Sequence, residues 1–64
     1  MKPSWNDAPE WANYLAQDEN GEWTWFARKP WIVRDVFVSP DEWDYAEVTS
    51  DPTGWRDTLD SRPT

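Results

Sequence analysis

The sequence of 64 residues contains neither cysteine nor histidine. A domain of this length buries only about 60% of the surface that its unfolded chain exposes, so small domains commonly rely on disulfides or a structural metal. Without these residues there is no disulfide, and the common zinc ligands are missing. The same absences remove the thiolate nucleophile and the imidazole base on which many enzymes depend. We therefore expect a non-enzymatic protein without a metal or a cofactor.

Basic residues are also scarce. Six lysines and arginines stand against thirteen aspartates and glutamates, which gives a net charge of −7. Affinity for phosphates comes mainly from clustered lysine and arginine, so we expect no direct binding to nucleic acid and none to an anionic membrane. No apolar run approaches the ~18 residues of a membrane span, and the first residues lack the apolar stretch of a signal peptide. The expected location is the cytoplasm.

Tryptophan is the residue in excess, with seven copies in the chain. Each indole buries roughly 150–250 Å² in a core, so these rings can replace the missing disulfides and metal. An aromatic content of 17% favours a folded chain despite the high net charge. We expect one small domain over residues 1–64 with frayed ends. Homodimerisation would be another way to cover surplus apolar surface.

Two interpretations compete for the N-terminal part of the chain. A short helix over residues 9–16 would place Trp11 and Leu15 on one face. Alternatively, residues 11–17 form a strand that enters a hairpin. Alanine, glutamate and leucine suit a helix, and no β-branched residue is present, so we favour the helix.

The clearest turn lies at Asn20-Gly21, because this dipeptide tolerates positive φ and commonly closes hairpins. Residues 22–27 follow as a strand, on which alternation places Trp23 and Trp25 on one face. Such a row is either the core face of a sheet or an exposed platform on which sugars stack. The core is favoured because so short a chain has little else to bury. A carbohydrate-binding module that uses exposed Trp23 and Trp25 is therefore the alternative function.

Residues 31–38 form the next predicted strand, because most of them are β-branched or aromatic. A charge interrupts each face, Arg34 on one and Asp35 on the other, which places this strand at an edge or end of its sheet. Alternation predicts a further strand over 43–48, and residues 55–59 are predicted to form a helical turn. The expected fold is α+β: a small antiparallel sheet of about three strands, with short helical segments at the N- and C-terminal sides.

The second half of the chain is strongly acidic. Seven acids and a single base, Arg56, lie between residues 41 and 60. A folded surface with spaced negative charge can be steered to a basic groove and can compete there with DNA. The plainer interpretation is that net charge keeps a small protein soluble. These acids lack the spacing of a calcium-binding loop, so no metal site is expected.

Exposed aromatic residues near these acids are the expected anchors of a binding surface, because tryptophan is enriched at binding hot spots. The carboxylates around them would attract a basic partner. The predicted partner-binding residues are Trp31, Trp43, Tyr45, Asp41, Glu42, Asp44 and Glu47.

Several tryptophan-centred patterns run through the chain. They are Trp5-x-x-Ala8-Pro9-x-Trp11-Ala12, Asp18-x-x-Gly21-x-Trp23-x-Trp25-Phe26 with Pro30, and Trp55-Arg56-x-x-Leu59-x-x-Arg62-Pro63. Together these patterns resemble small, uncharacterised, Trp-rich accessory proteins of tailed bacteriophages. The resemblance carries over no catalytic or binding residue. It implies an accessory protein that binds a host factor in the cytoplasm of the infected cell. The predicted function is thus a small acidic protein-interaction module, with DNA mimicry at a basic groove of the host protein as one mode of action.

Overall fold

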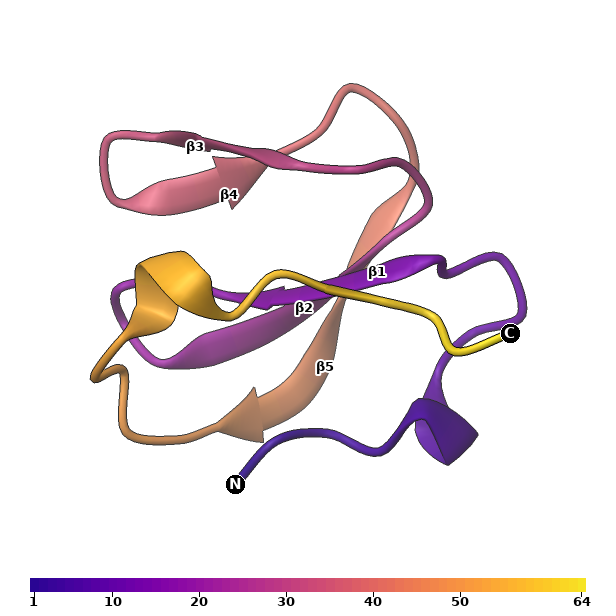
Figure 1. The fold of residues 1–64 in the computed structure, drawn as a ribbon, viewed down its shortest axis with the longest axis horizontal. Helices are drawn as coiled ribbons and strands as arrows, with labels where there is room; N and C mark the ends of the chain where they lie inside the picture. The colour runs from indigo at the N-terminus through magenta and orange to yellow at the C-terminus, as the bar shows by residue number, and fades with distance from the viewer.

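A computed structural model describes residues 1–64 and contains six short strands, two single 3-10 turns and no α-helix. In chain order the elements are η1 (Trp5–Asp7), β1 (Tyr14–Gln17), β2 (Glu22–Phe26), β3 (Trp31–Val33), β4 (Val36–Val38), β5 (Trp43–Thr49), η2 (Trp55–Asp57) and β6 (Asp60–Ser61). The strands form a four-stranded antiparallel sheet in the order β5-β2-β1-β6 and a separate hairpin of β3 and β4 (Figure 1). The predicted antiparallel sheet is confirmed. The predicted α+β class is wrong in its helical part, because the domain is mostly β.

The favoured helix over residues 9–16 is wrong, and the alternative strand is found as β1. Leu15 pairs with Trp25 of β2, and Ala16 pairs with Thr24. Both Leu15 and Ala16 are completely buried, although a strand sends them to opposite faces. A short helix would bury one stripe only, whereas this segment is covered on both sides. Burial and pairing with β2 therefore override the helix propensity of the segment.

The predicted strand over 31–38 is wrong as one strand, because it folds back on itself as the β3–β4 hairpin. Val33 pairs with Val36, which leaves Arg34 and Asp35 as a two-residue loop. Arg34 has a φ of 60°, the left-handed value that such tight hairpin loops require. The Glu19 N–H donates to the Asp35 carbonyl at 3.2 Å, which ties this loop to the turn between β1 and β2. The two charges that interrupt the apolar pattern thus mark a turn and not the faces of an edge strand.

Replacing Arg34 with glycine should stabilise the domain by about 0.5–1 kcal/mol. Glycine adopts a positive φ without the steric penalty that arginine has there, and this gain is larger than the entropic cost of ordering a glycine. Asp35 is the matched control, since it is not among the residues with positive φ. Asp35→Gly should lower stability, because the entropy that glycine adds to the unfolded chain is not offset there by relief of backbone strain. Urea unfolding of both variants measures the difference. Equal shifts of the two midpoints would contradict the assigned loop conformation.

The four-stranded sheet is covered on both faces, which divides the hydrophobic core into two clusters. The first contains Ala12, Leu15, Trp23 and Trp25, with Trp5, Ala8, Trp11, Ala46 and Val48 packed against it. The second contains Ala16, Phe26, Phe37 and Trp55, with Tyr14, Ile32 and Leu59 packed against it. The hairpin lies on one side of the sheet and the N-terminal segment on the other (Figure 1). Five of the seven tryptophans therefore belong to the core.

The two ends of the chain contact each other at the β6 edge of the sheet. The Lys2 ammonium donates to the Asp60 carboxylate at 2.6 Å, and the Trp5 indole N–H donates to the same oxygen at 3.2 Å. These two hydrogen bonds hold the pKa of Asp60 below its ordinary value, and the one from Lys2 has the larger effect. Arg62 donates to the carbonyls of Ala12 and Pro9 at 2.6 and 2.8 Å.

The helical turn predicted over 55–59 is shorter than expected, because only the 3-10 turn η2 forms. Gly54 precedes it with a φ of 77°. The Thr58 hydroxyl ends the turn by donating to the Trp55 carbonyl at 2.7 Å. Trp55 and Leu59 still meet in the second core cluster, as their spacing predicted.

Candidate functional site

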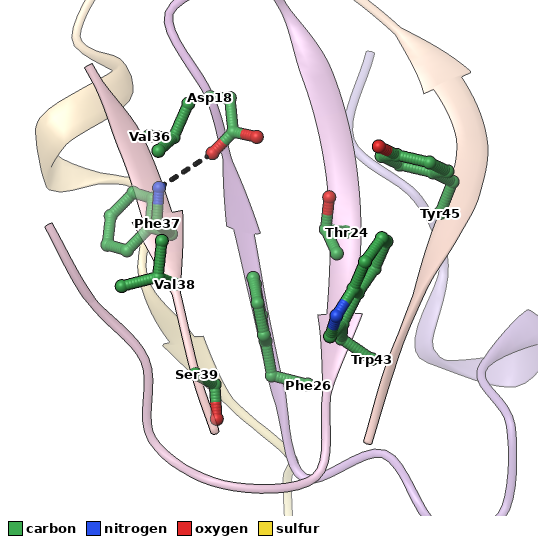
Figure 2. A pocket seen from close by; sticks show the side chains of 9 residues that line it. All are labelled: Asp18, Thr24, Phe26, Val36, Phe37, Val38, Ser39, Trp43 and Tyr45. Carbon is green, nitrogen blue, oxygen red and sulfur yellow. Dashed lines mark hydrogen bonds between the residues drawn. The ribbon is translucent and has the colours of Figure 1, made fainter. Parts of the chain in front are cut away.

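An apolar cleft of about 270 Å³ opens between the hairpin and the β2–β5 part of the sheet (Figure 2). Its lining residues are Asp18, Thr24, Phe26, Val36, Phe37, Val38, Ser39, Trp43 and Tyr45. Pockets for drug-sized ligands commonly measure about 300–1,000 Å³. This cleft is therefore of the size that takes one side chain or a small molecule.

The strand register builds the floor and one wall of the cleft. Thr24 pairs with Tyr45, and Phe26 pairs with Trp43, so all four side chains lie on the same face of the sheet. The rings of Trp43 and Tyr45 meet edge to face, with 5.1 Å between their centroids. Both remain about half exposed, at 49% and 47%. This aromatic wall is an apolar surface that the fold leaves partly uncovered.

A carboxylate lies at one end of the cleft. One oxygen of Asp18 accepts a hydrogen bond from the Phe37 N–H at 2.9 Å, and the other accepts none from the protein. Burial raises the pKa of Asp18 above its ordinary value, and repulsion from Glu22 and Asp35 adds to this effect. The hydrogen bond from Phe37 opposes it without cancelling it. The fold thus keeps a partly desolvated acid across the cleft from an aromatic wall (Figure 2), and titratable groups with a shifted pKa cluster at functional sites.

Two hydroxyl groups of the cleft have no hydrogen-bond partner. They belong to Thr24 and Ser39, and both oxygen atoms are buried. Figure 2 shows the Thr24 hydroxyl on the side of Asp18 and Ser39 at the opposite end of the cleft. Buried polar groups in folded proteins are almost always paired, so these hydroxyls offer unused capacity to a bound group.

Replacing Asp18 with asparagine should stabilise the domain at neutral pH, because the amide still accepts from Phe37 but carries no charge to desolvate. A raised pKa means that the folded state holds the Asp18 proton more tightly than the unfolded state does. The stability that Asp18 contributes is therefore present at low pH and is lost as the pH rises through the raised pKa. The advantage of the variant should shrink as the pH is lowered towards 3.8, the ordinary value for Asp. Thermal unfolding at several pH values measures it, and a pH-independent difference would contradict the prediction.

The structure brings together two of the three predicted aromatic anchors. Trp43 and Tyr45 line the cleft, whereas Trp31 lies on the hairpin, 52% exposed, and does not line it. Asp18, Thr24 and Phe37 also line the cleft but were not predicted from the sequence. In the sequence, Asp18 was recognisable only as part of a turn, and Thr24 and Phe37 only as residues of predicted strands.

The predicted carboxylates are dispersed around β5. Asp44 and Glu47 line a second hollow, together with Asp7 and Glu22 and next to Trp25, on the other face of the sheet. Glu42 is exposed in the loop before β5. Asp41 in the same loop forms an exposed ion pair with Arg28 at 3.3 Å. The structure contains no group of three or more acids that could hold a metal ion.

The rings needed by the carbohydrate-binding alternative are not at the surface. Trp23 and Trp25 are 6% and 3% exposed, and both belong to the first core cluster. The Trp23 indole N–H is also occupied, because it donates to the Ser50 hydroxyl at 2.6 Å. Sugar stacking needs open ring faces, and this pair offers none.

The structure holds no helix with the length and apolar character that crossing a membrane would require. No protein-family model matches this sequence, and comparisons with curated proteins and with solved structures give no match.

Proposed function

We propose that this chain is a small interaction module that binds a basic protein partner at the cleft between the hairpin and β5. The aromatic wall of Trp43 and Tyr45 is the observation that carries the proposal. Exposed apolar patches often mark interaction sites, and large aromatic side chains dominate the binding energy of many interfaces. The wall needs little ordering on binding, because the two rings already contact each other.

The charge of the domain supports a basic partner. The net charge is −7, and the cleft itself contains a carboxylate, Asp18, but no lysine or arginine. Asp44 and Glu47 lie on the other face of the sheet and add to the negative field of the domain. Such a field accelerates the encounter with a positively charged protein and is screened by salt. A nucleic-acid-binding protein with a basic groove meets this requirement.

We also propose a biological setting for this interaction. The tryptophan patterns that resemble phage accessory proteins make a host protein the proposed partner, and the host cytoplasm the proposed location. Binding is proposed instead of catalysis because the cleft offers one carboxylate and two hydroxyls. Apart from Asp18, the Tyr45 phenol is the one titratable group that lines the cleft, so the cleft lacks the paired acid and base of many catalytic sites.

The proposal is tested by affinity capture from a bacterial lysate, in which the wild-type domain is compared with two variants. The immobilised domain, the Trp43→Ala variant and the Trp31→Ala variant are exposed to the same lysate. Trp31 is the matched control, since it is equally exposed but lies outside the cleft. We expect a basic protein that the wild type and the Trp31→Ala variant retain, that the Trp43→Ala variant loses, and that salt elutes. Retention by all three forms, or loss with Trp31→Ala alone, would contradict the proposed site.

A further inference from the structure

We propose that the cleft receives an arginine side chain of the partner, with its guanidinium group between Asp18 and the aromatic wall. This inference rests on the proposed function and names the group that the module recognises. It follows from three features of the cleft: its unused acceptors, its aromatic wall and its size.

The acceptors lie where a cation with several N–H groups would need them. The second oxygen of Asp18 accepts no hydrogen bond from the protein, and the Thr24 hydroxyl has no partner although the residue is only 3% exposed. Both groups lie towards the same end of the cleft (Figure 2). An ionised carboxylate can only accept hydrogen bonds, so the ligand must donate. A guanidinium carries five donors in a plane, which is enough for the carboxylate and the hydroxyl together.

The aromatic wall selects for the same group. Trp43 and Tyr45 line the cleft opposite the β4 edge (Figure 2). A cation over an aromatic face is attracted by the ring quadrupole, most strongly over tryptophan. Guanidinium also stacks on rings and is more weakly hydrated than ammonium, so it enters a partly desolvated cleft at a lower cost. Arginine therefore fits better than lysine.

The remaining walls suit the stem of that side chain. Val36, Val38 and Phe26 supply apolar surface to the lining of the cleft. A volume of about 270 Å³ leaves room for one extended side chain and not for a whole peptide segment. Long basic side chains commonly bury their methylene stems in this way while the charged end is paired.

Titration with blocked tripeptides tests the inference on the intact domain by NMR. The probes are Gly-Arg-Gly, Gly-Lys-Gly and Gly-citrulline-Gly with capped ends, where citrulline keeps the shape of arginine but has no charge. We expect the arginine peptide to shift the signals of the Trp43 indole N–H and the Phe37 amide. The lysine peptide should bind more weakly and the citrulline peptide at least about tenfold more weakly, because its charge is missing. Equal binding of arginine and citrulline peptides, or no shift with the arginine peptide, would overturn the inference.

Three variants locate the binding within the cleft. Asp18→Asn should weaken the arginine peptide by about tenfold or more, and Thr24→Val should weaken it several-fold, because each removes an acceptor. Asp44→Asn is the matched control, since it also removes one negative charge but lies outside the cleft. Its affinity should stay near that of the wild type. An Asp18→Asn variant that folds and binds the peptide as the wild type does would overturn the inference.

The capture experiment separates this inference from the proposed function. If Trp43→Ala loses the partner but Asp18→Asn retains it, the module binds at the aromatic wall and the arginine inference fails. If Trp43→Ala retains the partner, the proposed function itself fails. Loss of the partner with both variants supports both proposals.

Discussion

Replacing Trp25 with alanine is expected to remove much of the stability of the domain. Trp25 is 3% exposed in the first core cluster, and its ring lies 5.0 Å from that of Trp5. Truncation of a buried tryptophan commonly costs about 3–5 kcal/mol, because the lost contacts leave a cavity. A domain of this length has a total stability of about 3–10 kcal/mol, so one such cavity removes much of it. Circular dichroism and urea unfolding measure the loss.

Trp31→Ala is the control for this prediction. Its ring is 52% exposed, and no core cluster includes it. Surface substitutions of this kind change stability by within about 0.5 kcal/mol. If both variants lost the same amount of stability, the division between core and surface tryptophans would be wrong. Phe26→Leu offers an intermediate case, since it keeps an apolar side chain in the second cluster.

Gly21→Ala is expected to destabilise the domain by roughly 2–4 kcal/mol, because strain and overlap add at one position. Gly21 has a φ of 90°, which side chains rarely tolerate. An added Cβ would also overlap the carbonyl oxygen of Ser50, which is backbone and cannot turn away. The Ser50 N–H donates to the Gly21 carbonyl at 3.0 Å, and the buried Gln17 amide donates to both carbonyls. The turn after β1 is therefore held against the end of β5.

Gly54→Ala separates the two causes. Gly54 has a φ of 77°, but a Cβ there would meet nothing within 4 Å. Gly54→Ala should therefore lower the free energy of unfolding only by the cost of holding alanine at positive φ, about 1–2 kcal/mol. Thermal unfolding of both variants gives the comparison. An equal loss at the two positions would show that the close approach of Gly21 to Ser50 does not exist in the folded protein.

The parts of the fold that the sequence predicted are those with a strong local signal. Alternation and aromatic residues correctly placed β2 and β5, and Asn20-Gly21 correctly placed the turn. The segment of β1 failed because its residues favour a helix, and its strand form depends on pairing with β2 and on burial from both sides. The β3–β4 hairpin failed because its loop contains Arg34, a residue with no preference for positive φ.

The candidate site was predictable only in part, for a similar reason. Trp43 and Tyr45 were predicted because they lie among the acids of the second half of the chain, which are visible in the sequence. Asp18 and Thr24 come from different elements, and their place in the same cleft as Trp43 depends on the register of β2 with β5 and on the position of the hairpin. No local pattern encodes either. Asp44 was predicted to lie at the site because it follows Trp43 in the sequence. Alternation along β5 instead places its side chain on the other face of the sheet.

The central claim is that most tryptophans build the core while Trp31 and Trp43 remain at the surface. Indole N–H signals in a ¹H–¹⁵N spectrum, recorded with a soluble paramagnetic relaxation agent, test it directly. Single Trp→Phe variants assign the seven signals. We predict strong broadening of the Trp31 and Trp43 signals and little broadening of those of Trp23 and Trp25. A Trp43 signal as protected as that of Trp25 would contradict the account, because the cleft would then have no exposed aromatic wall.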